Sequence, residues 1–176
     1  MELIMIRKSL HHYSELNAVQ FVTFRTRDSV DGYLQRINNH NELTTSEKQM
    51  KIDVYCDQLD KGCHLNDDVI TIVINSLRQL EPQYYKLYAL SIMPNHVHML
   101  FQQNSELKIV MQKIKGATAR LINRHLSKQG GLWERGYFDK AIRDEQHFKL
   151  VYDYIKNNAV KAKLHDAPKR FYGIYD

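Results

Sequence analysis

The sequence is poor in the residues that cross-link a chain or hold it in a membrane. Its two cysteines, Cys56 and Cys63, are too few for a disulfide framework and, without a second pair, for a four-ligand zinc site. No apolar run approaches the roughly 20 residues of a transmembrane helix. The start MELIMIRKSL lacks the parts of a secretory signal. These absences predict a cytoplasmic protein with free thiols and no membrane partner.

Proline and glycine are scarce as well, with three prolines and seven glycines in 176 residues. The chain contains no flexible linker, internal repeat or low-complexity tract. Its 43% hydrophobic and 26% charged residues are typical of a folded globular protein. The length is that of one ordinary domain, so we expect a single domain over residues 1–176.

Positive charge is concentrated in the second part of the chain. Residues 1–104 carry 10 Lys and Arg against 12 Asp and Glu, whereas residues 105–176 carry 15 against 8, a net charge of +7. A basic region suits a polyanion, because phosphate contacts release condensed counterions. A solvated basic face explains the same numbers, so charge alone leaves nucleic-acid binding open.

The first part of the chain predicts one strand and one helix separated by a polar segment. Residues 18–27 (AVQFVTFRTR) alternate in hydrophobicity and are rich in β-formers, which favours a strand. Residues 29–65 are polar with a weak helical rhythm and indicate an inserted helical or loop segment. Asn66, Asp67 and Asp68 then precede an apolar stripe at helical spacing, as at the start of a helix.

The remainder predicts a hairpin, a long helix, a fourth strand and a last helix. Residues 84–92 and 96–103 are apolar or aromatic runs joined by the turn-forming Pro94 and Asn95. The expected later elements are a helix over 107–126, a strand over 136–143 and a helix over 144–161. This order favours an α+β fold, an antiparallel sheet backed by helices of the ferredoxin-like or split βαβ kind.

The segment MPNHVHML places two histidines on one face of the second hairpin strand. Residues i and i+2 of a strand project to the same side, so His96 and His98 lie next to each other. Two imidazoles can hold a divalent metal if at least one more ligand comes from elsewhere. A polar strand face without a metal fits the same pattern.

The last helix offers that further ligand. Tyr154 and Asn158 are four residues apart, so both lie near one edge of the apolar stripe centred on Ile155. An amide oxygen can bind a hard divalent ion. Tyr152 lies about 160° from Tyr154 around the helix, on the other side of the stripe. A boundary tyrosine next to a surface asparagine remains the alternative interpretation.

These segments carry a family resemblance. MPNHVHML resembles the histidine-hydrophobic-histidine motif of the single-tyrosine HUH transposases. LWERGYFDKAIRDEQHFKLVYDYIKNNAVKAKL is similar to the carboxy-terminal block of their REP-associated branch, and KIKGATARLIN fits the helix between the two blocks. The resemblance extends over roughly residues 17–164, and the order and separation of the motifs make it specific.

The resemblance implies a site and an activity. His96, His98 and Asn158 correspond to the metal ligands, with magnesium or manganese as the ion, and Tyr154 to the nucleophile. The implied enzyme cuts and rejoins hairpin-forming single-stranded DNA through a 5′-phosphotyrosine intermediate, as a monomer or homodimer. The chain departs from the family at Ala159, where the family has a proline that would end the helix.

Other residues are candidates for contact with DNA. Trp133, Tyr137 and Phe138 can stack on unpaired bases or belong to the core. The basic residues expected to contact phosphate are Arg25, Arg27, Lys108, Lys113, Lys115, Arg120, Arg124, Arg135 and Arg143.

Two other functions remain open at this level. One is a catalytically silent DNA-binding protein on the same fold, against which the intact histidines and Tyr154 argue. The other is a metal-dependent phosphoesterase that attacks with activated water and does not need Tyr154.

Overall fold

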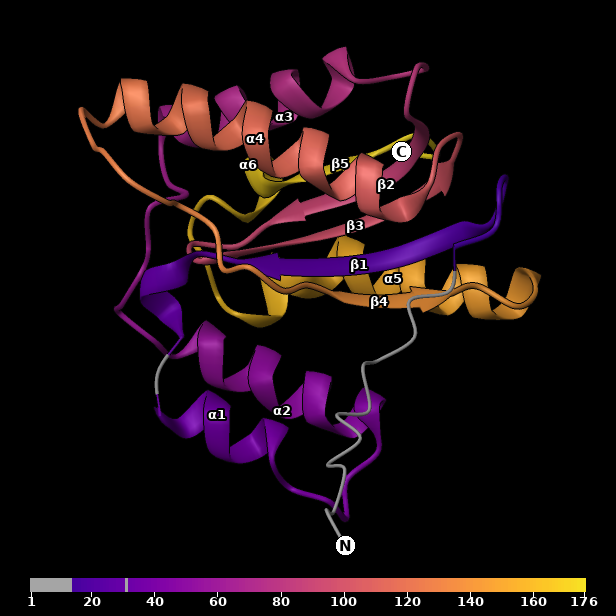
Figure 1. Ribbon diagram of the computed structural model, residues 1–176, viewed down its shortest axis with the longest axis horizontal. Coiled ribbons are helices and arrows are strands. Elements are labelled where there is room, and N and C mark those ends of the chain that lie inside the picture. The colour runs from indigo at the N-terminus through magenta and orange to yellow at the C-terminus, as the bar shows by residue number, and fades with distance from the viewer. Residues whose placement is uncertain (1–13, 31) are drawn as a thin grey trace, which may run out of the picture.

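The computed structural model describes residues 14–30 and 32–176 (Figure 1). The predictions about the start of the chain therefore fall on residues 1–13, outside the described part. The α-helices of the described residues are α1 (Gly32–Asn38), α2 (Thr45–Asp57), α3 (Asp68–Gln79), α4 (Leu107–His125), α5 (Glu145–Lys161) and α6 (Ala167–Arg170). The strands are β1 (Val19–Arg25), β2 (Tyr85–Ile92), β3 (His96–Gln103), β4 (Phe138–Ala141) and β5 (Phe171–Gly173). A short 3-10 turn over Arg27–Ser29 follows β1.

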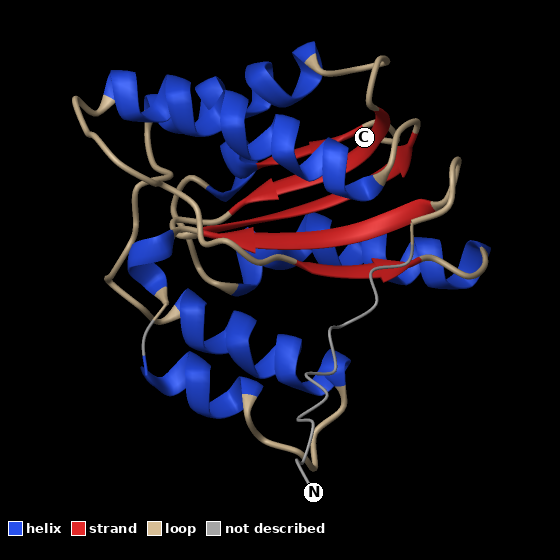
Figure 2. Cartoon of the chain, in the orientation of Figure 1, coloured by secondary structure: helices blue, strands red, loops and turns tan. Residues whose placement is uncertain are grey.

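The strands form one open sheet in the order β4-β1-β3-β2-β5, and every neighbouring pair is antiparallel (Figure 2). β3 lies between β1 and β2, so β1, α3 and β2 form a βαβ unit that is split by β3. The sheet and its helices confirm the predicted α+β class and the split βαβ architecture.

The main core lies between the sheet and the layer of α3 and α4 (Figure 1). Alternate residues of the strands supply it, because successive side chains of a strand point to opposite faces. Val22, Phe24, Val97 and Met99 are fully buried in this core. The residues that alternate with these along the strands, such as Phe21 of β1, therefore face the other side of the sheet.

That second face is covered by α5. Its Val151 and Ile155 pack with Phe21 of β1 and Leu100 of β3. The helix begins at Asp144, whose side chain accepts a 2.7 Å hydrogen bond from the backbone N–H of His147. The site residues of β3 therefore point toward α5.

The segment over 29–65 contains α1 and α2, which lie on the α5 side of the sheet (Figure 1). α2 begins with a capping box in which Thr44 and Glu47 bond each other's backbone N–H. The two helices have a small core of their own, made by Leu34, Ile37, Ile52 and Cys56. They form a hairpin that packs internally rather than as part of the sheet core.

Two regions differ from the sequence-based expectation. β4 starts at Phe138 and not at residue 136, because the carbonyl of Gly136 accepts a hydrogen bond from the Lys115 ammonium. The sequence did not predict α6 or β5, which are only four and three residues long. In the described part of the chain, no helix has the length and apolar character to cross a bilayer.

Candidate active site

Two imidazoles lie at the centre of the sheet face that α5 and α2 cover. His96 and His98 of β3 are fully buried, and their ring centroids are 4.8 Å apart. The strand places both on one face, as the i, i+2 spacing predicts. Burial lowers the pKa of both imidazoles, well below the ordinary value in the case of His96, which keeps them neutral and able to bind a metal.

Hydrogen bonds orient each ring with Nε2 toward the site. The Nδ1 atom of His96 lies 2.7 Å from the amide oxygen of Asn95, to which only an Nδ1–H can donate. The Nδ1 atom of His98 lies 2.8 Å from the Thr23 hydroxyl. Both Nε2 atoms are buried and have no hydrogen-bond partner, which is the arrangement of metal-binding histidines held by a second layer of residues.

Asn158 of α5 contributes a third atom of this kind. Its side-chain oxygen is buried and has no hydrogen-bond partner. An unsatisfied buried polar atom costs about 1–3 kcal/mol, and Asn158 lines a cleft together with Asp53 and Tyr154, which contact the histidines. His96, His98 and Asn158 fit a divalent metal, which would satisfy all three unpartnered atoms at once.

Asp53 of α2 also reaches the histidines. Asp53, His96 and His98 each place one potential ligand atom within 4.8 Å of the ligand atoms of the other two. Asp57, one helical turn later, has a carboxylate oxygen 3.7 Å from His96 Nε2. Two imidazoles with amide and carboxylate oxygens form a mixed set of donors that suits several divalent ions, manganese among them. The sequence analysis did not identify Asp53.

Tyr154 of α5 lies against the same group of residues. Its hydroxyl donates a 2.8 Å hydrogen bond to Asp53 Oδ2, and its ring meets the His98 ring edge to face at 5.4 Å. Burial and the nearby carboxylates of Asp53 and Asp57 raise the pKa of Tyr154 above its usual value, while the Asn158 amide lowers it. The phenol is therefore protonated at rest, next to a carboxylate that can accept its proton.

Tyr152 points to a different part of the molecule. Its hydroxyl donates a 2.8 Å hydrogen bond to Asp176 Oδ2 and accepts one from the backbone N–H of Tyr175. Its ring packs against Phe171 of β5. The structure therefore brings Tyr154, and not Tyr152, to the histidines.

Two of the basic residues expected to contact phosphate are used inside the protein. Arg25 is 7% exposed, and its Nη2 donates to Gln49 and lies 3.5 Å from Asp53. The Lys115 ammonium donates to the backbone carbonyls of Glu134, Arg135 and Gly136. Burial lowers the pKa of Lys115 to about 8. Arg25 lies next to the site, whereas Lys115 holds a loop.

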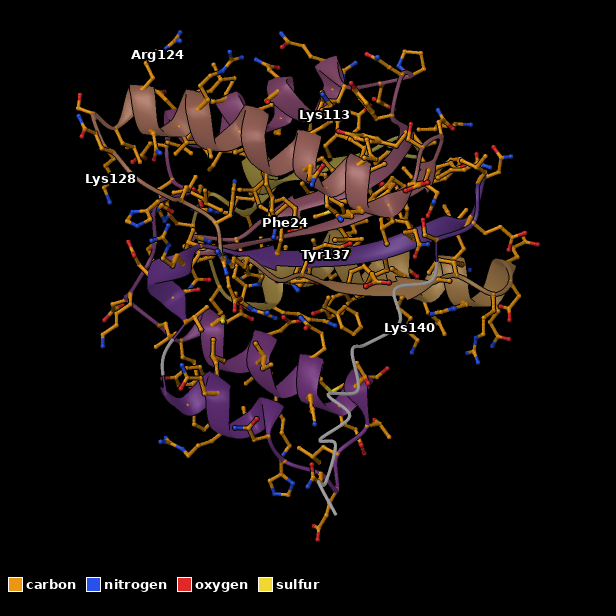
Figure 3. The ribbon with its side chains drawn as sticks, in the orientation of Figure 1. Phe24, Lys113, Arg124, Lys128, Tyr137 and Lys140 are labelled. Atoms are coloured by element: carbon orange, nitrogen blue, oxygen red, sulfur yellow. The ribbon has the colours of Figure 1, made fainter. Side chains whose placement is uncertain are left out.

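The other cations are exposed and are distributed over the surface. Figure 3 shows Lys113 and Arg124 on α4, across the sheet from α5 and Tyr154. The exposed residues of the predicted set are Arg27, Lys108, Lys113, Arg120, Arg124, Arg135 and Arg143. The structure does not bring the α4 residues to the histidines.

The three candidate stacking residues have different environments. Trp133 is buried against Phe24, and its indole N–H donates to Thr118, so it belongs to the core. Tyr137 and Phe138 are partly exposed. Both line a cleft of about 490 Å³ between α2 and the loop before β4.

A second cleft, of about 380 Å³, opens at Tyr154 itself. It lies between α2 and the end of α5, and Asp53, Asp57, Asn158 and Lys161 are among the residues that line it. Through it, solvent and small solutes approach the Tyr154 side of the buried site.

Comparison with known proteins gives three similarities. Residues 60–158 match the family model described as "Transposase IS200 like". A sequence provisionally named REP-associated tyrosine transposase, from Haemophilus influenzae, is 28% identical over 109 residues, which are 52% of this chain and 62% of the relative. A solved REP-associated tyrosine transposase bound to a REP hairpin superposes with a TM-score of 0.52 and 15% identity, over 87% of this chain and 73% of that chain.

Proposed function

Because this chain belongs to the IS200-like transposase family, we propose that it cuts and rejoins single-stranded DNA with Tyr154 as the nucleophile. The observation that carries the proposal is the contact of Tyr154 with Asp53 and His98, next to buried atoms without hydrogen-bond partners on His96, His98 and Asn158. A tyrosine that only packed in a core would have no reason to share its site with three such atoms.

His96, His98 and Asn158 would hold a divalent metal, magnesium or manganese, with Asp53 as a further ligand. The metal would supply positive charge that polarises the scissile phosphate. Asn95 and Thr23 fix the two imidazoles through their Nδ1 atoms, so the Nε2 lone pairs are already aimed at the ion.

Tyr154 carries out the covalent step. Its oxygen attacks phosphorus and the bond to the 3′-oxygen of the DNA breaks; the departing oxygen takes a proton from water, so that a 5′-phosphotyrosyl link and a 3′-hydroxyl result. Asp53 lies 2.8 Å from the phenol oxygen and accepts the proton that the attack releases. Attack by a 3′-hydroxyl on the same link reverses the step, so rejoining needs no external energy source.

The DNA partner that we propose is a hairpin with single-stranded flanks. The solved REP-associated tyrosine transposase with a similar fold is bound to a REP hairpin, and residues 105–176 of this chain supply a net positive charge. The described residues act as one transposase domain into which α1 and α2 are inserted. In support, the family match begins at residue 60, after α2 ends.

The test is covalent capture on a denaturing gel, with labelled single-stranded hairpin DNA and manganese. The unsubstituted protein should form an adduct, and Tyr154→Phe should form none, because a phenyl ring has no atom to attack phosphorus. Tyr152→Phe is the matched control, since it makes the same change two residues away and should retain the adduct.

The outcomes separate the alternatives. An adduct that survives in Tyr154→Phe but not in Tyr152→Phe would move the nucleophile to Tyr152. Binding without adduct or product would indicate a silent DNA-binding protein. Product without adduct would indicate hydrolysis by activated water.

A further inference from the structure

The cleft between α2 and the loop before β4 lies beside the active site and has no role in the step described above. Its lining includes Arg25, Lys48, Glu134 and Tyr137, and its volume is about 490 Å³. Clefts of this size hold small organic ligands. Because its wall includes Gln49, which bonds Asp53, the cleft begins one hydrogen bond away from the carboxylate that contacts Tyr154.

Arg25 indicates the chemistry of the ligand. Its side chain is nine-tenths buried; Nη2 donates to Gln49 and lies 3.5 Å from Asp53, while Nε is buried and has no hydrogen-bond partner, so one donor is left over after these internal contacts. An unmatched donor of a buried guanidinium is costly and favours an anion nearby. Lys48 of α2 lines the same cleft, as does Ile52 one helical turn later. Together these two cations suit a phosphate.

The opposite wall suits a base. Tyr137 is partly exposed there, and the loop that carries it is held in place by the three hydrogen bonds of Lys115. The Lys115 ammonium also lies 5.4 Å from the centroid of the Tyr137 ring. Glu134 adds a carboxylate that can accept from an exocyclic amino group of a base. A fixed aromatic ring next to an acceptor can stack on and orient an unpaired base.

We infer that this cleft holds one unpaired nucleotide of the DNA strand next to the scissile phosphate, with its phosphate on Arg25 and Lys48 and its base on Tyr137. The inference rests on the proposed function for the identity of the strand. One side of the cleft comes from residues 41–52, which precede the family match at residue 60. Contacts from that side are therefore particular to chains with this helical hairpin.

The experiment measures binding in EDTA, where no cleavage takes place, by fluorescence anisotropy with a labelled 12-nucleotide single strand. Tyr137→Leu, which keeps an apolar side chain, and Lys48→Gln should each weaken binding about fivefold or more, in keeping with the energy of one stacked base or one phosphate contact. Lys51→Gln is the matched control, because Lys51 is exposed on the same helix and does not line the cleft. Its binding should be unchanged.

A second set of strands, each with one abasic position, locates the base. One position should weaken binding to the unsubstituted protein, and that effect should vanish in Tyr137→Leu. The inference is wrong if the abasic effects are the same in both proteins, or if Lys51→Gln loses as much affinity as Lys48→Gln. The two experiments are separate. Failure of covalent capture would refute the proposed function, whereas the binding measured without metal confirms or refutes the role of the cleft.

Discussion

The hydroxyl of Tyr154 on α5 donates a 2.8 Å hydrogen bond to the carboxylate of Asp53 on α2, which is 101 residues earlier in the chain. The contact joins the helix of the proposed nucleophile to a helix that packs outside the sheet core. Asp53 also lies within ligand distance of the two histidines. One carboxylate can therefore affect both the proton of the phenol and the metal.

Asp53→Asn should slow covalent capture by about tenfold or more. The amide cannot take up the phenol proton and is a weaker metal ligand than a carboxylate. The measurement is the single-turnover rate of adduct formation at saturating manganese, with the unfolding midpoint as a check on folding. An unchanged rate in a folded variant would remove Asp53 from the reaction.

Removal of a proposed metal ligand should weaken the binding of manganese. His98→Ala and Asn158→Ala each remove one of the unpartnered buried atoms and should weaken manganese binding by at least about tenfold, as loss of even an outer-layer partner does. Isothermal titration in the absence of DNA measures it. His165→Ala is the control, because this histidine is exposed and lines a different cleft. Equal losses in all three variants would contradict the site.

The stability of the metal-free protein should depend on pH below about 6.5. Burial lowers the pKa of His96 and His98 in the folded state, so the unfolded chain binds more protons at these residues, and stability falls as the pH falls below about 6.5. Asp57 acts in the opposite direction. Burial and Asp53 raise its pKa to about 7, so the folded state gains one proton that the unfolded chain lacks.

The two imidazoles and Asp57 therefore affect the dependence of stability on pH in opposite directions. Asp57→Asn should steepen the loss of stability with falling pH, and His98→Leu should make it shallower. Urea unfolding at several pH values measures each slope. Identical slopes in the three proteins would mean that these groups are not titrating as described.

Lys115→Met should destabilise the protein by about 2 kcal/mol. It removes an ammonium that donates to three carbonyls of the loop before β4, and bonds of this charged kind are among the stronger ones. Urea unfolding at neutral pH is the measurement. Lys108→Met, at an exposed position on the same helix, should change stability by less than about 0.5 kcal/mol. Similar values for the two would show that the loop does not depend on Lys115.

The sequence predicted the sheet and its main helices because their patterns are strong. β1, the hairpin of β2 and β3, and α3, α4 and α5 all match the expected segments to within a few residues. Local spacing also placed His96 and His98 on one face, and Tyr154 near Asn158, without any knowledge of tertiary contacts. These relations lie within a single strand or helix, where periodicity decides them.

Asp53 could not be identified in the same way. The side of α2 that is buried toward the site includes Gln49 and Asp53, so polar residues occupy positions at which a periodicity analysis expects apolar ones. One local signal was present, since Thr44 and Glu47 have the spacing of a capping box and mark the start of α2. This capping box predicts where α2 begins. It does not predict that Asp53 contacts Tyr154 and the histidines, because nothing in the sequence places α2 over the sheet face.

The separate core of the α1–α2 hairpin means that the proposed active site is built from two parts that pack independently. The histidines and Tyr154 are fixed by elements that also build the cores of the sheet. Hydrogen bonds join α2 to that framework: Asp53 and Gln49 accept from Tyr154 and Arg25, and the backbone carbonyl of Cys56 accepts a 2.9 Å bond from the Asn95 side chain. Substitutions inside the hairpin can therefore accumulate without repacking the sheet. The α2 side of the site can therefore be altered by mutation while the framework that carries His96, His98 and Tyr154 keeps its packing.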